Sequence, residues 1–392
     1  MAARRVALAL ACVVTIVCAL PVAAQSTRVE AIEREQAAKA KDTGKEGPSE
    51  AELVVRRILA SPLLSGGDGA YPWFGSVYGG TGMGLGAGYT KHLENAASLN
   101  VQTGISLNNS LLVRGSVAAP EFWRGTLQVD ASAQYLDARG VSYYGGQGSD
   151  RQDRERFDYS PFELTGNATV KPAQRLALTG TYSFLGFDTQ RDVPRLTEQD
   201  APGLDRSLSY HVARGTAMFD WRPSKGYSTR GGFLRASAER NIETQAKPYS
   251  YSLQEFEAVQ LVPLVREQFV LAGRALMTLT QPDHGDTVPV VLLPYLGSGS
   301  AFRGYANRRF ADRNRLLLSG EYRWRPSRYL DMALFVDAGQ VAPDPADFEA
   351  GRFETAWGLG ARLHGPTFNA VRIEVARGRE GIRVIVSGSQ PF

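Results

Sequence analysis

The sequence predicts an all-β protein, a sixteen-stranded antiparallel transmembrane β-barrel with a short N-terminal periplasmic tail. Three observations predict this fold class: an export leader, a polar–apolar alternation of period two along most of the chain, and a separation of short from long connections between the alternating segments. The first concerns the compartment, the second the faces of the strands and the third the loops. They are therefore independent of one another.

The first residues have the composition of a signal peptide. Arg4 and Arg5 form a positive start, 6–22 is almost purely apolar, and 22–24 (Val-Ala-Ala) supplies the small residues of a cleavage site. A transmembrane anchor is the alternative, but the apolar run is short for a bilayer span. We therefore expect residues 1–24 to be removed on export.

Removal of the leader changes the chemistry that the chain can carry. Both cysteines, Cys12 and Cys18, lie in the leader, which excludes disulfides, thiolate zinc sites and cysteine nucleophiles from the mature protein. The formal charge of +4 falls to +2 because Arg4 and Arg5 leave and no acid does, so we expect no nucleic-acid partner. The mean hydropathy of -0.23 still permits a membrane barrel, because half of each strand's residues face away from lipid.

Residues 25–69 are predicted to form a periplasmic tail. The stretch 26–50 is charged and lacks large apolar groups, which indicates a flexible segment. A short amphipathic helix follows, with Pro62 at its end and apolar residues at helical spacing: Leu53, Val54, Ile58 and Leu59. The helix could pack at the mouth of the barrel or act as a plug, and the sequence leaves both open.

From about residue 70 to residue 392 the period becomes two. In 127–135, Leu127, Val129, Ala131, Ala133 and Tyr135 alternate with polar residues, and 330–337 and 370–375 behave in the same way, with Val371, Ile373 and Val375 facing away from Arg372 and Glu374. This is the apolar-out, polar-in pattern of a membrane barrel. A soluble sandwich alternates as well, so alternation alone does not decide.

The connections decide between barrel and sandwich. The candidate strands are 70–78, 83–91, 97–107, 110–118, 125–136, 157–170, 175–187, 208–222, 229–240, 251–262, 268–280, 314–325, 330–341, 352–363, 370–379 and 382–391. All the long connections fall on one side of this set: 137–156, 188–207, 241–250, 281–313 and 342–351. Short turns opposite long loops are typical of outer-membrane barrels, so we expect the cell outer membrane as the location.

The longest connection, 281–313, carries the sequence GSAFRGYANRRF at 299–310. A barrel of sixteen strands is too wide for its own side chains to fill, so we expect this loop to fold into the lumen. An arginine placed there needs carboxylate partners, because a buried unpaired charge is costly. Glu321 and Asp337 lie on inward faces of the next two strands, and we predict that Arg303 docks between them, with Gly304 allowing a tight turn.

These segments resemble a known family. The run FRGYANRRFADRNRLLLSGEYRW, followed by LFVDAG at 334–339, is similar to the C-terminal barrel of the bacterial surface antigen superfamily, which contains the BamA and TamA assembly factors and the two-partner secretion transporters. The resemblance implies a lumen-loop motif of Phe302, Arg303, Gly304 and Tyr305, with Glu321 and Asp337 as the acids that meet the arginine.

Other segments extend the resemblance over roughly 70–392. YYGGQGSD at 143–150 resembles the family's glycine-rich outer loop, and FDWRPSKGYSTRGGFL resembles its aspartate-x-arginine turn, carried here by Asp220, Arg222 and Gly231. The family's closing strand ends in an aromatic residue, and Phe392 stands at that position as the barrel signal. One departure is the lack of any strand pattern before residue 70, so the family's polypeptide-transport-associated domains are expected to be absent.

The resemblance implies protein or lipid insertion or translocation at the outer membrane. The expected partners are the lipid bilayer, a polypeptide or lipid client and a separate periplasmic protein that replaces the missing domains. The alternative is a passive channel or a structural barrel that keeps only the architecture.

A glycine series marks the second predicted strand. Gly82, Gly84, Gly86 and Gly88 alternate with Met83, Leu85, Ala87 and Tyr89 and are predicted to share one face. Glycine weakens a strand and permits close approach of another backbone. The series could receive the folded-in loop, loosen the wall near the seam between the first and last strands, or serve ordinary curvature.

The sequence predicts no catalysis, no metal and no cofactor. The histidines at 92, 211, 284 and 364 stand alone, without metal-ligand spacing. In PDHGD, His284 lies beside Asp283 and Asp286, which leaves a surface hydrolase as a third class, although loop polarity explains the run more simply. The elbow-like GSGSA at 297–301 fails at its last position.

Overall fold

The structure is a computed structural model that describes residues 68–387, apart from 94–96, 123–124, 153, 194, 266, 299–301, 328 and 366–368. Several expectations lie outside the described residues: the signal peptide, the amphipathic helix of the tail and the terminal Phe392. No helix of the described part is long and apolar enough to cross a membrane.

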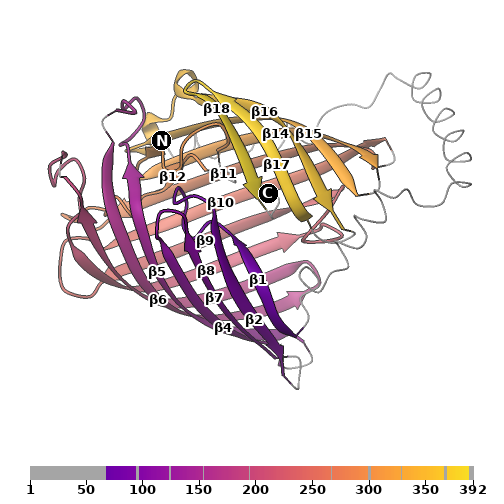
Figure 1. Ribbon diagram of the computed structural model, residues 1–392, viewed down its shortest axis with the longest axis horizontal. Coiled ribbons are helices and arrows are strands. Elements are labelled where there is room, and N and C mark those ends of the chain that lie inside the picture. The colour runs from indigo at the N-terminus through magenta and orange to yellow at the C-terminus, as the bar shows by residue number, and fades with distance from the viewer. Residues whose placement is uncertain are drawn as a thin grey trace, which may run out of the picture.

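Sixteen strands form one antiparallel sheet in which neighbours in the chain are neighbours in space (Figure 1). They are β1 (Gly69–Gly75), β2 (Gly84–His92), β3 (Ser98–Ser106), β4 (Leu111–Phe122), β5 (Leu127–Tyr143), β6 (Glu155–Ala173), β7 (Leu176–Arg191), β8 (Ser207–Asp220), β9 (Gly231–Glu243), β10 (Tyr251–Val265), β11 (Phe269–Pro282), β14 (Asn314–Ser327), β15 (Leu330–Ala342), β16 (Glu354–His364), β17 (Asn369–Gly378) and β18 (Gly381–Ser387). The sheet curls into a nearly closed barrel, which confirms the predicted fold class.

The sheet has two edges, β1 and β18, and we call the junction between them the seam. In Figure 1 the indigo and yellow edge strands face each other at the front of the barrel. Among the described residues, no backbone pairing joins β1 to β18. The seam is therefore the one place in the described sheet where the hydrogen-bond ladder is interrupted.

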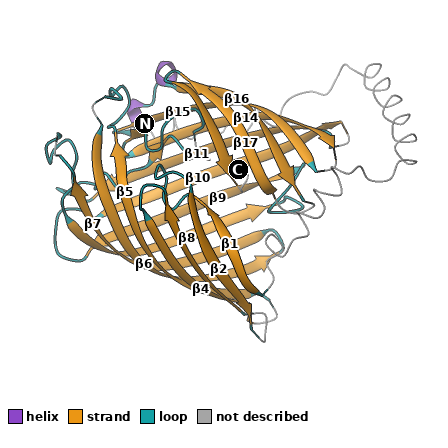
Figure 2. Ribbon diagram, viewed as in Figure 1, coloured by secondary structure: helices purple, strands orange, loops and turns teal. Residues whose placement is uncertain are grey.

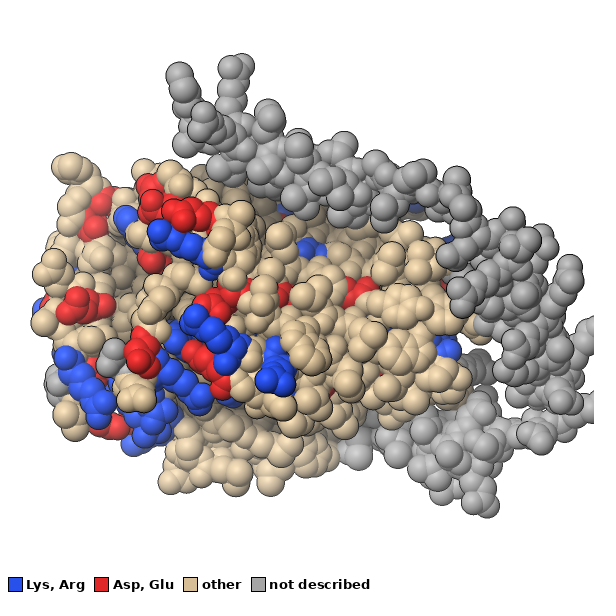
Figure 3. All heavy atoms as spheres, turned by 90° about the horizontal axis from the view of Figure 1, so that it is seen from above, with Lys and Arg blue, Asp and Glu red and all other residues tan. Residues whose placement is uncertain are grey.

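Side chains alternate as a membrane wall requires. On β17, Val371 and Ile373 are exposed, whereas Arg372 and Glu374 are fully buried on the inner face. Figure 3 shows charged side chains gathered at one end of the molecule, while the visible wall beyond is mostly tan. The outward apolar face and inward polar face follow from the period of two.

Connections differ strongly between the two ends of the barrel. One end carries 144–154, 192–206 and 283–313, and the other carries turns such as 174–175 and 266–268. We call these the long-loop end and the short-turn end. Strand β5 runs to Tyr143 and β6 begins at Glu155, so the loop predicted at 137–156 is shorter than expected. Strands β5, β6 and β7 have 17, 19 and 16 residues and continue past their predicted ends.

Several short elements that were not predicted from the sequence lie at the long-loop end (Figure 2). Two short strands, β12 (Tyr295–Leu296) and β13 (Phe310–Ala311), pair within the longest loop, and two 3-10 turns, η2 (Pro345–Asp347) and η3 (Ala350–Arg352), lie between β15 and β16. They are too short to show a hydrophobic period.

The interior at the long-loop end is a packed core. Val288, Val290 and Val291 of the longest loop belong to one buried cluster with Tyr159 and Tyr210 of the wall. A second cluster joins Phe302, Tyr305 and Phe310 of the same loop to wall residues Leu276, Leu317, Val341 and Ala356. The connection 283–313, hereafter the lumen loop, thus supplies the apolar filling that sixteen strands cannot supply themselves.

Candidate functional site

The lumen loop is shaped by backbone positions that favour glycine. Gly297 has φ +99°, and a Cβ there would lie 2.0 Å from the carbonyl oxygen of Ala306. Gly304 has φ +91°, and a Cβ there would lie 2.9 Å from Cβ of Ala356 and 3.0 Å from N of Gly378. At both positions the positive φ disfavours any residue with a Cβ, and neighbouring atoms leave no room for one. The turn at Gly304 directs the preceding arginine to the wall.

Arg303 contacts both predicted acids. Its Nε and Nη2 donate to Asp337 Oδ2 and Oδ1 at 2.8 and 2.6 Å, and its Nη1 donates to Glu321 Oε1 at 2.5 Å. The backbone N of Arg303 also donates to Asp337 Oδ2 at 3.2 Å. The guanidinium carbon lies 3.6 Å from the centre of the Phe335 ring. A two-pronged contact of this kind fixes both the position and the orientation of the arginine.

The contact is part of a larger network, which we call the arginine–carboxylate cluster. Glu374 of β17 is a third acid, 3.3 Å from Arg303 Nη1. Three wall arginines share these carboxylates: Arg362 bonds Glu321 at 2.9 Å and Glu374 at 3.0 Å, Arg323 bonds Glu321 at 2.7 Å, and Arg372 bonds Glu374 at 3.1 Å. Four guanidinium groups therefore surround three carboxylates, and all seven residues are buried.

Burial makes this arrangement demanding. Only 2% of Arg303 is exposed, and Glu374 is not exposed at all. Burial by itself lowers the pKa of Arg303, but the hydrogen-bonded Asp337 and the charges of Glu321 and Glu374 more than offset this and hold the pKa above its usual value. An ion pair in such surroundings is stable only when every partner is present, because an uncompensated buried charge costs several kcal/mol, ~3–5 when one partner is removed.

Aromatic side chains hold the rest of the motif. Phe302 and Tyr305 stack with ring centres 4.7 Å apart, and Phe310 meets Tyr305 edge-on at 5.3 Å. The Tyr305 hydroxyl donates to Glu354 Oε2 at 2.9 Å, and burial raises the pKa of Tyr305 to about 12, so it remains a neutral donor. The tip of the lumen loop is therefore fixed to β16 by packing as well as by charge.

The lumen loop also reaches both turns that flank the seam at the long-loop end. Asn307 Nδ2 donates to the carbonyl oxygen of Gly79, in the β1–β2 connection, at 2.7 Å. Arg309 Nε donates to Glu380, in the β17–β18 turn, at 2.5 Å, and its Nη2 donates to the carbonyl oxygen of Ser149 at 2.7 Å. One loop thus connects the two edges of the sheet.

The glycine series behaves differently from the prediction at one position. Gly82 lies in the β1–β2 connection with φ +82° and not on a face of β2, because the strand begins only at Gly84. A Cβ at Gly88 would lie 2.1 Å from the Tyr71 ring, and one at Gly86 would lie 1.9 Å from the carbonyl oxygen of Thr103. These glycines make room for neighbouring strands and an aromatic side chain, and not for the lumen loop.

The aspartate-x-arginine turn forms a local clamp. Asp220 accepts from Nε and Nη2 of Arg222 at 3.1 and 3.0 Å, and Arg222 lies over the Phe233 ring at 4.4 Å. Gly231 has φ +83°, and a Cβ there would lie 2.5 Å from the Trp221 carbonyl oxygen. The glycine-rich outer loop packs on the lumen loop, since Ala311 N donates to the Gly145 carbonyl oxygen at 3.0 Å.

The histidines have acidic or aromatic neighbours that spacing did not reveal. His364 stacks on Tyr227 with ring centres 3.9 Å apart and lies 3.2 Å from Asp331. His284 is exposed, while Asp283 pairs with Arg240 at 2.5 Å and Asp286 accepts from Ser250 N at 2.8 Å. Both acids of the PDHGD run thus have structural partners. The described residues contain no group of three or more potential metal ligands.

Arg323, Arg362, Arg372 and Glu374 complete the arginine–carboxylate cluster, and Phe335 packs on Arg303, but none of these five was proposed as a site residue from the sequence. Their signal was present in part: Arg372 and Glu374 lie on the predicted inward face of their strand, as Phe335 does on β15. Inward parity places a residue in the lumen but does not say which arginine it meets, because that depends on the curvature of the barrel.

A family model described as the Omp85 superfamily domain matches residues 75–378. The chain belongs to the Omp85 superfamily. The family prediction made from the lumen-loop motif is thereby confirmed. No protein of curated function matches the chain significantly.

Solved Omp85-type barrels share the fold of this Omp85 chain. BamA from Haemophilus ducreyi lacking POTRA domains 1–3 superposes with a TM-score of 0.63 at 14% identity, covering 81% of this chain and 69% of BamA. CdiB from Escherichia coli gives 0.56 at 15% identity, covering 81% of this chain and 61% of CdiB. CdiB from Acinetobacter baumannii gives 0.50 at 13% identity, with 76% and 53% covered. At these identities the likeness concerns the barrel alone.

Proposed function

We propose that this Omp85 barrel inserts or translocates polypeptide or lipid clients at the outer membrane, and that the seam is the place where they pass. The lumen loop holds the working state through the Arg303 contact. No bond chemistry is involved, and no cofactor or metal is needed. The partners are the bilayer, the client and a separate periplasmic protein that presents the client.

The interrupted ladder at the seam supports this proposal. A strand at the edge of a sheet offers unpaired N–H and C=O groups that can template another strand. On β18, Ile382, Val384 and Val386 are 66%, 68% and 58% exposed, so this edge is covered by little else among the described residues. A client strand could therefore pair with β1 or β18 without first breaking a continuous ladder.

The uneven attachment of the lumen loop supports the same proposal. Toward β14–β17 the loop is held by the buried arginine–carboxylate cluster and by the Tyr305 stack. Toward β1–β2 it is held without a described ion pair: the Asn307 amide donates to the Gly79 carbonyl oxygen, and Val77 and Tyr78 pack in the apolar cluster that contains Val288 of the loop. A neutral hydrogen bond contributes about 1 kcal/mol to stability. This is far less than the free energy lost when one partner of a buried ion pair is removed. The β1–β2 edge can thus leave while the loop stays on the opposite wall.

A passive channel is the competing function. The apolar clusters formed by the lumen loop fill the interior at the long-loop end, which opposes a steady wide pore. Planar-bilayer conductance separates the two functions. A large open state in the absence of any client would favour the channel.

A disulfide between the lumen loop and the β1–β2 connection tests the proposal without changing Arg303. A Cβ at Gly79 would lie 2.9 Å from Cγ of Asn307, so the pair G79C/N307C is close enough to bridge. We expect the oxidised pair to insert a urea-unfolded eight-stranded barrel into vesicles several-fold more slowly than the reduced pair. The single variant N307C under the same oxidant is the control. Equal rates for the oxidised and reduced pair would contradict a mobile seam.

A further inference from the structure

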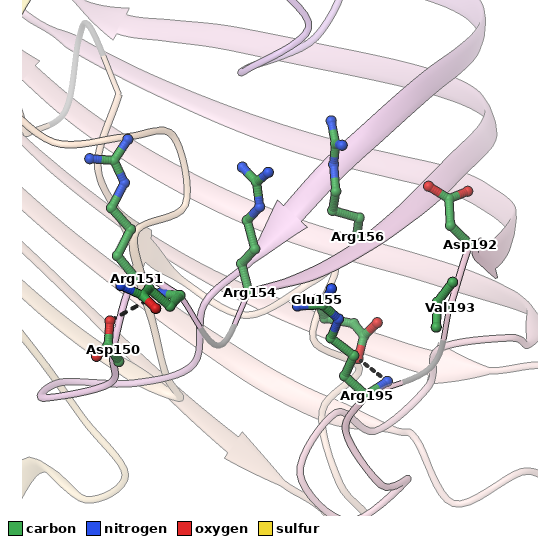
Figure 4. A pocket seen from close by; sticks show the side chains of 9 residues that line it. Asp150, Arg151, Arg154, Glu155, Arg156, Asp192, Val193 and Arg195 are labelled. Carbon is green, nitrogen blue, oxygen red and sulfur yellow. Dashed lines mark hydrogen bonds between the residues drawn. The ribbon is translucent and has the colours of Figure 1, made fainter.

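A basic cleft opens at the long-loop end, between the β5–β6 and β7–β8 connections. Its volume is about 670 Å³, and its charged lining residues are four arginines and three acids: Arg151, Arg154, Arg156, Arg195, Asp150, Glu155 and Asp192. Figure 4 shows the side chains of Arg151, Arg154 and Arg156 extending in the same direction, while Glu155 turns toward Arg195. The seam and the arginine–carboxylate cluster do not contribute to this cleft.

Arg156 lies on the lipid-facing side of the wall, and the side chains of Arg151 and Arg154 extend in the same direction as that of Arg156 (Figure 4). On β6 the outward residues are Phe162 and Leu164, 42% and 45% exposed, and the β6–β7 register is continuous from Phe157 to Val170. Arg156 has the same parity as Phe162, and it is exposed between two buried neighbours, Glu155 and Phe157. Arg156 thus continues the outer face of the barrel above its apolar band.

The height of the cleft limits the ligand. Six residues separate Phe162 from Arg156, about 20 Å along a strand, or about 15 Å along the bilayer normal at the tilt of a membrane barrel. A phospholipid headgroup layer is only about 5–8 Å thick. The cleft therefore lies beyond simple phosphodiester headgroups but within reach of a larger one that extends outward from the bilayer.

The charges nearby leave the three arginines available. On the neighbouring strand β5, Arg139 is paired with Asp137 at 2.9 Å and with Asp158 of β6 at 3.6 Å. Glu155 Oε2 accepts from the backbone N of Arg195 and of Leu196, both at 2.9 Å. Among the described residues, no carboxylate forms an ion pair with Arg151, Arg154 or Arg156. Of the other two acids that line the cleft, Asp150 accepts from the backbone N of Gln152 at 2.9 Å, and Asp192 has no described partner.

We propose that this cleft binds the phosphorylated saccharide headgroup of a glycolipid in the outer leaflet. Guanidinium groups match phosphate oxygens in two-pronged hydrogen bonds, and exposed arginines near a membrane surface attract anionic lipids. The long loops of such barrels face outward, which places the cleft over that leaflet. A free phosphate or sugar phosphate carries the same chemistry, but without an acyl anchor it lacks the high local concentration of a lipid.

The test uses the full-length protein purified in a zwitterionic detergent and placed in phosphatidylcholine nanodiscs. Binding of a bisphosphorylated glucosamine glycolipid is compared between the wild type and R151Q/R154Q/R156Q. The matched control is K171Q/R175Q/K225Q, which removes the same charge from exposed positions at the short-turn end. Retained heat-modifiable mobility shows that each variant is folded.

We expect the triple variant at the cleft to bind the glycolipid roughly tenfold or more weakly and the control to bind as the wild type does, since each arginine near an anionic surface contributes about 1 kcal/mol. D192N is expected to bind more tightly, because a neighbouring like charge to phosphate is removed. Equal binding of the dephosphorylated glycolipid, or of phosphatidylglycerol, would overturn the headgroup assignment. Equal affinity for the soluble sugar phosphate would replace the lipid by a small anion, and unchanged binding in the triple variant would overturn the site.

Discussion

The wall formed by β14–β17 and the strands at the seam belong to the same sheet but differ in what covers them. On β15, Ala333 and Asp337 are 0% and 1% exposed on the inner face, while Leu334 and Val336 point outward to lipid. On β18, most residues are exposed on both faces. The difference arises because the lumen loop lies against β14–β17 and reaches the edge strands only through their turns. Identical backbone pairing can therefore hold one side firmly and leave the other side easy to move.

Removal of Arg303 should disturb this contrast most. We expect R303A to lower the free energy of unfolding by about 3–5 kcal/mol, because Asp337 is left buried without its two-pronged partner. Denaturant unfolding followed by heat-modifiable mobility measures the loss. R303K should recover only part of it, since lysine cannot form the bidentate contact.

The control for R303A is R379A. Arg379 lies in the turn between β17 and β18, is 66% exposed and pairs with Glu354, so its loss should cost at most about 1 kcal/mol. If R303A and R379A were equally stable, burial in the arginine–carboxylate cluster would not be the source of the firmness of this wall.

Substitution of Gly304 should cause the second-largest loss of stability. G304A places a Cβ 2.9 Å from Ala356 Cβ at a φ of +91°, and we expect a loss of about 1–3 kcal/mol as the tip moves off β16. G285A is the matched variant, because Gly285 has φ +84° with open space around its Cβ. The difference between the two variants in denaturant unfolding isolates the contact from the backbone strain. No difference would mean that the tip packs less closely than described.

Loss of the Asn307 amide should affect the seam and not the opposite wall. We expect N307A to change global stability by about 1 kcal/mol or less, because one neutral hydrogen bond to the Gly79 carbonyl oxygen is removed. Hydrogen exchange should nevertheless rise in β1 and β2 while β15 remains protected. A uniform rise across both regions would remove the distinction between the two walls.

A pH effect at the long-loop end should be the smallest. The hydrogen bond that Asp283 accepts from Arg240 holds the pKa of this aspartate below its usual range. A carboxylate whose pKa is lowered by folding stabilises the fold at pH values above its unfolded-state pKa. This stabilisation is lost as the pH falls through the lowered pKa. We expect protease sensitivity of the loop near residue 283 to rise only in strong acid, and D283N to show that sensitivity already at neutral pH.

The fold could be predicted from the sequence because alternate residues of each strand face lipid and lumen, which gives every strand an apolar–polar period of two. The same period placed Glu321 and Asp337 on the inner face, and their short distance in the chain from Arg303 suggested the contact. Glu374 and Arg362 come from strands farther around the barrel, and only the curvature of the wall brings them together. Gly82 was misassigned because alternation does not reveal where a strand begins, whereas a positive φ ends the pairing.

The arginine–carboxylate cluster holds an odd number of charges. With the lumen loop in place, four guanidinium groups face three carboxylates, and Arg303 holds both oxygens of Asp337. Without Arg303 the wall would carry three charges of each sign, but Asp337 would lose its bidentate partner. The total charge of the wall therefore does not retain the loop, whereas the local charge of one buried aspartate does.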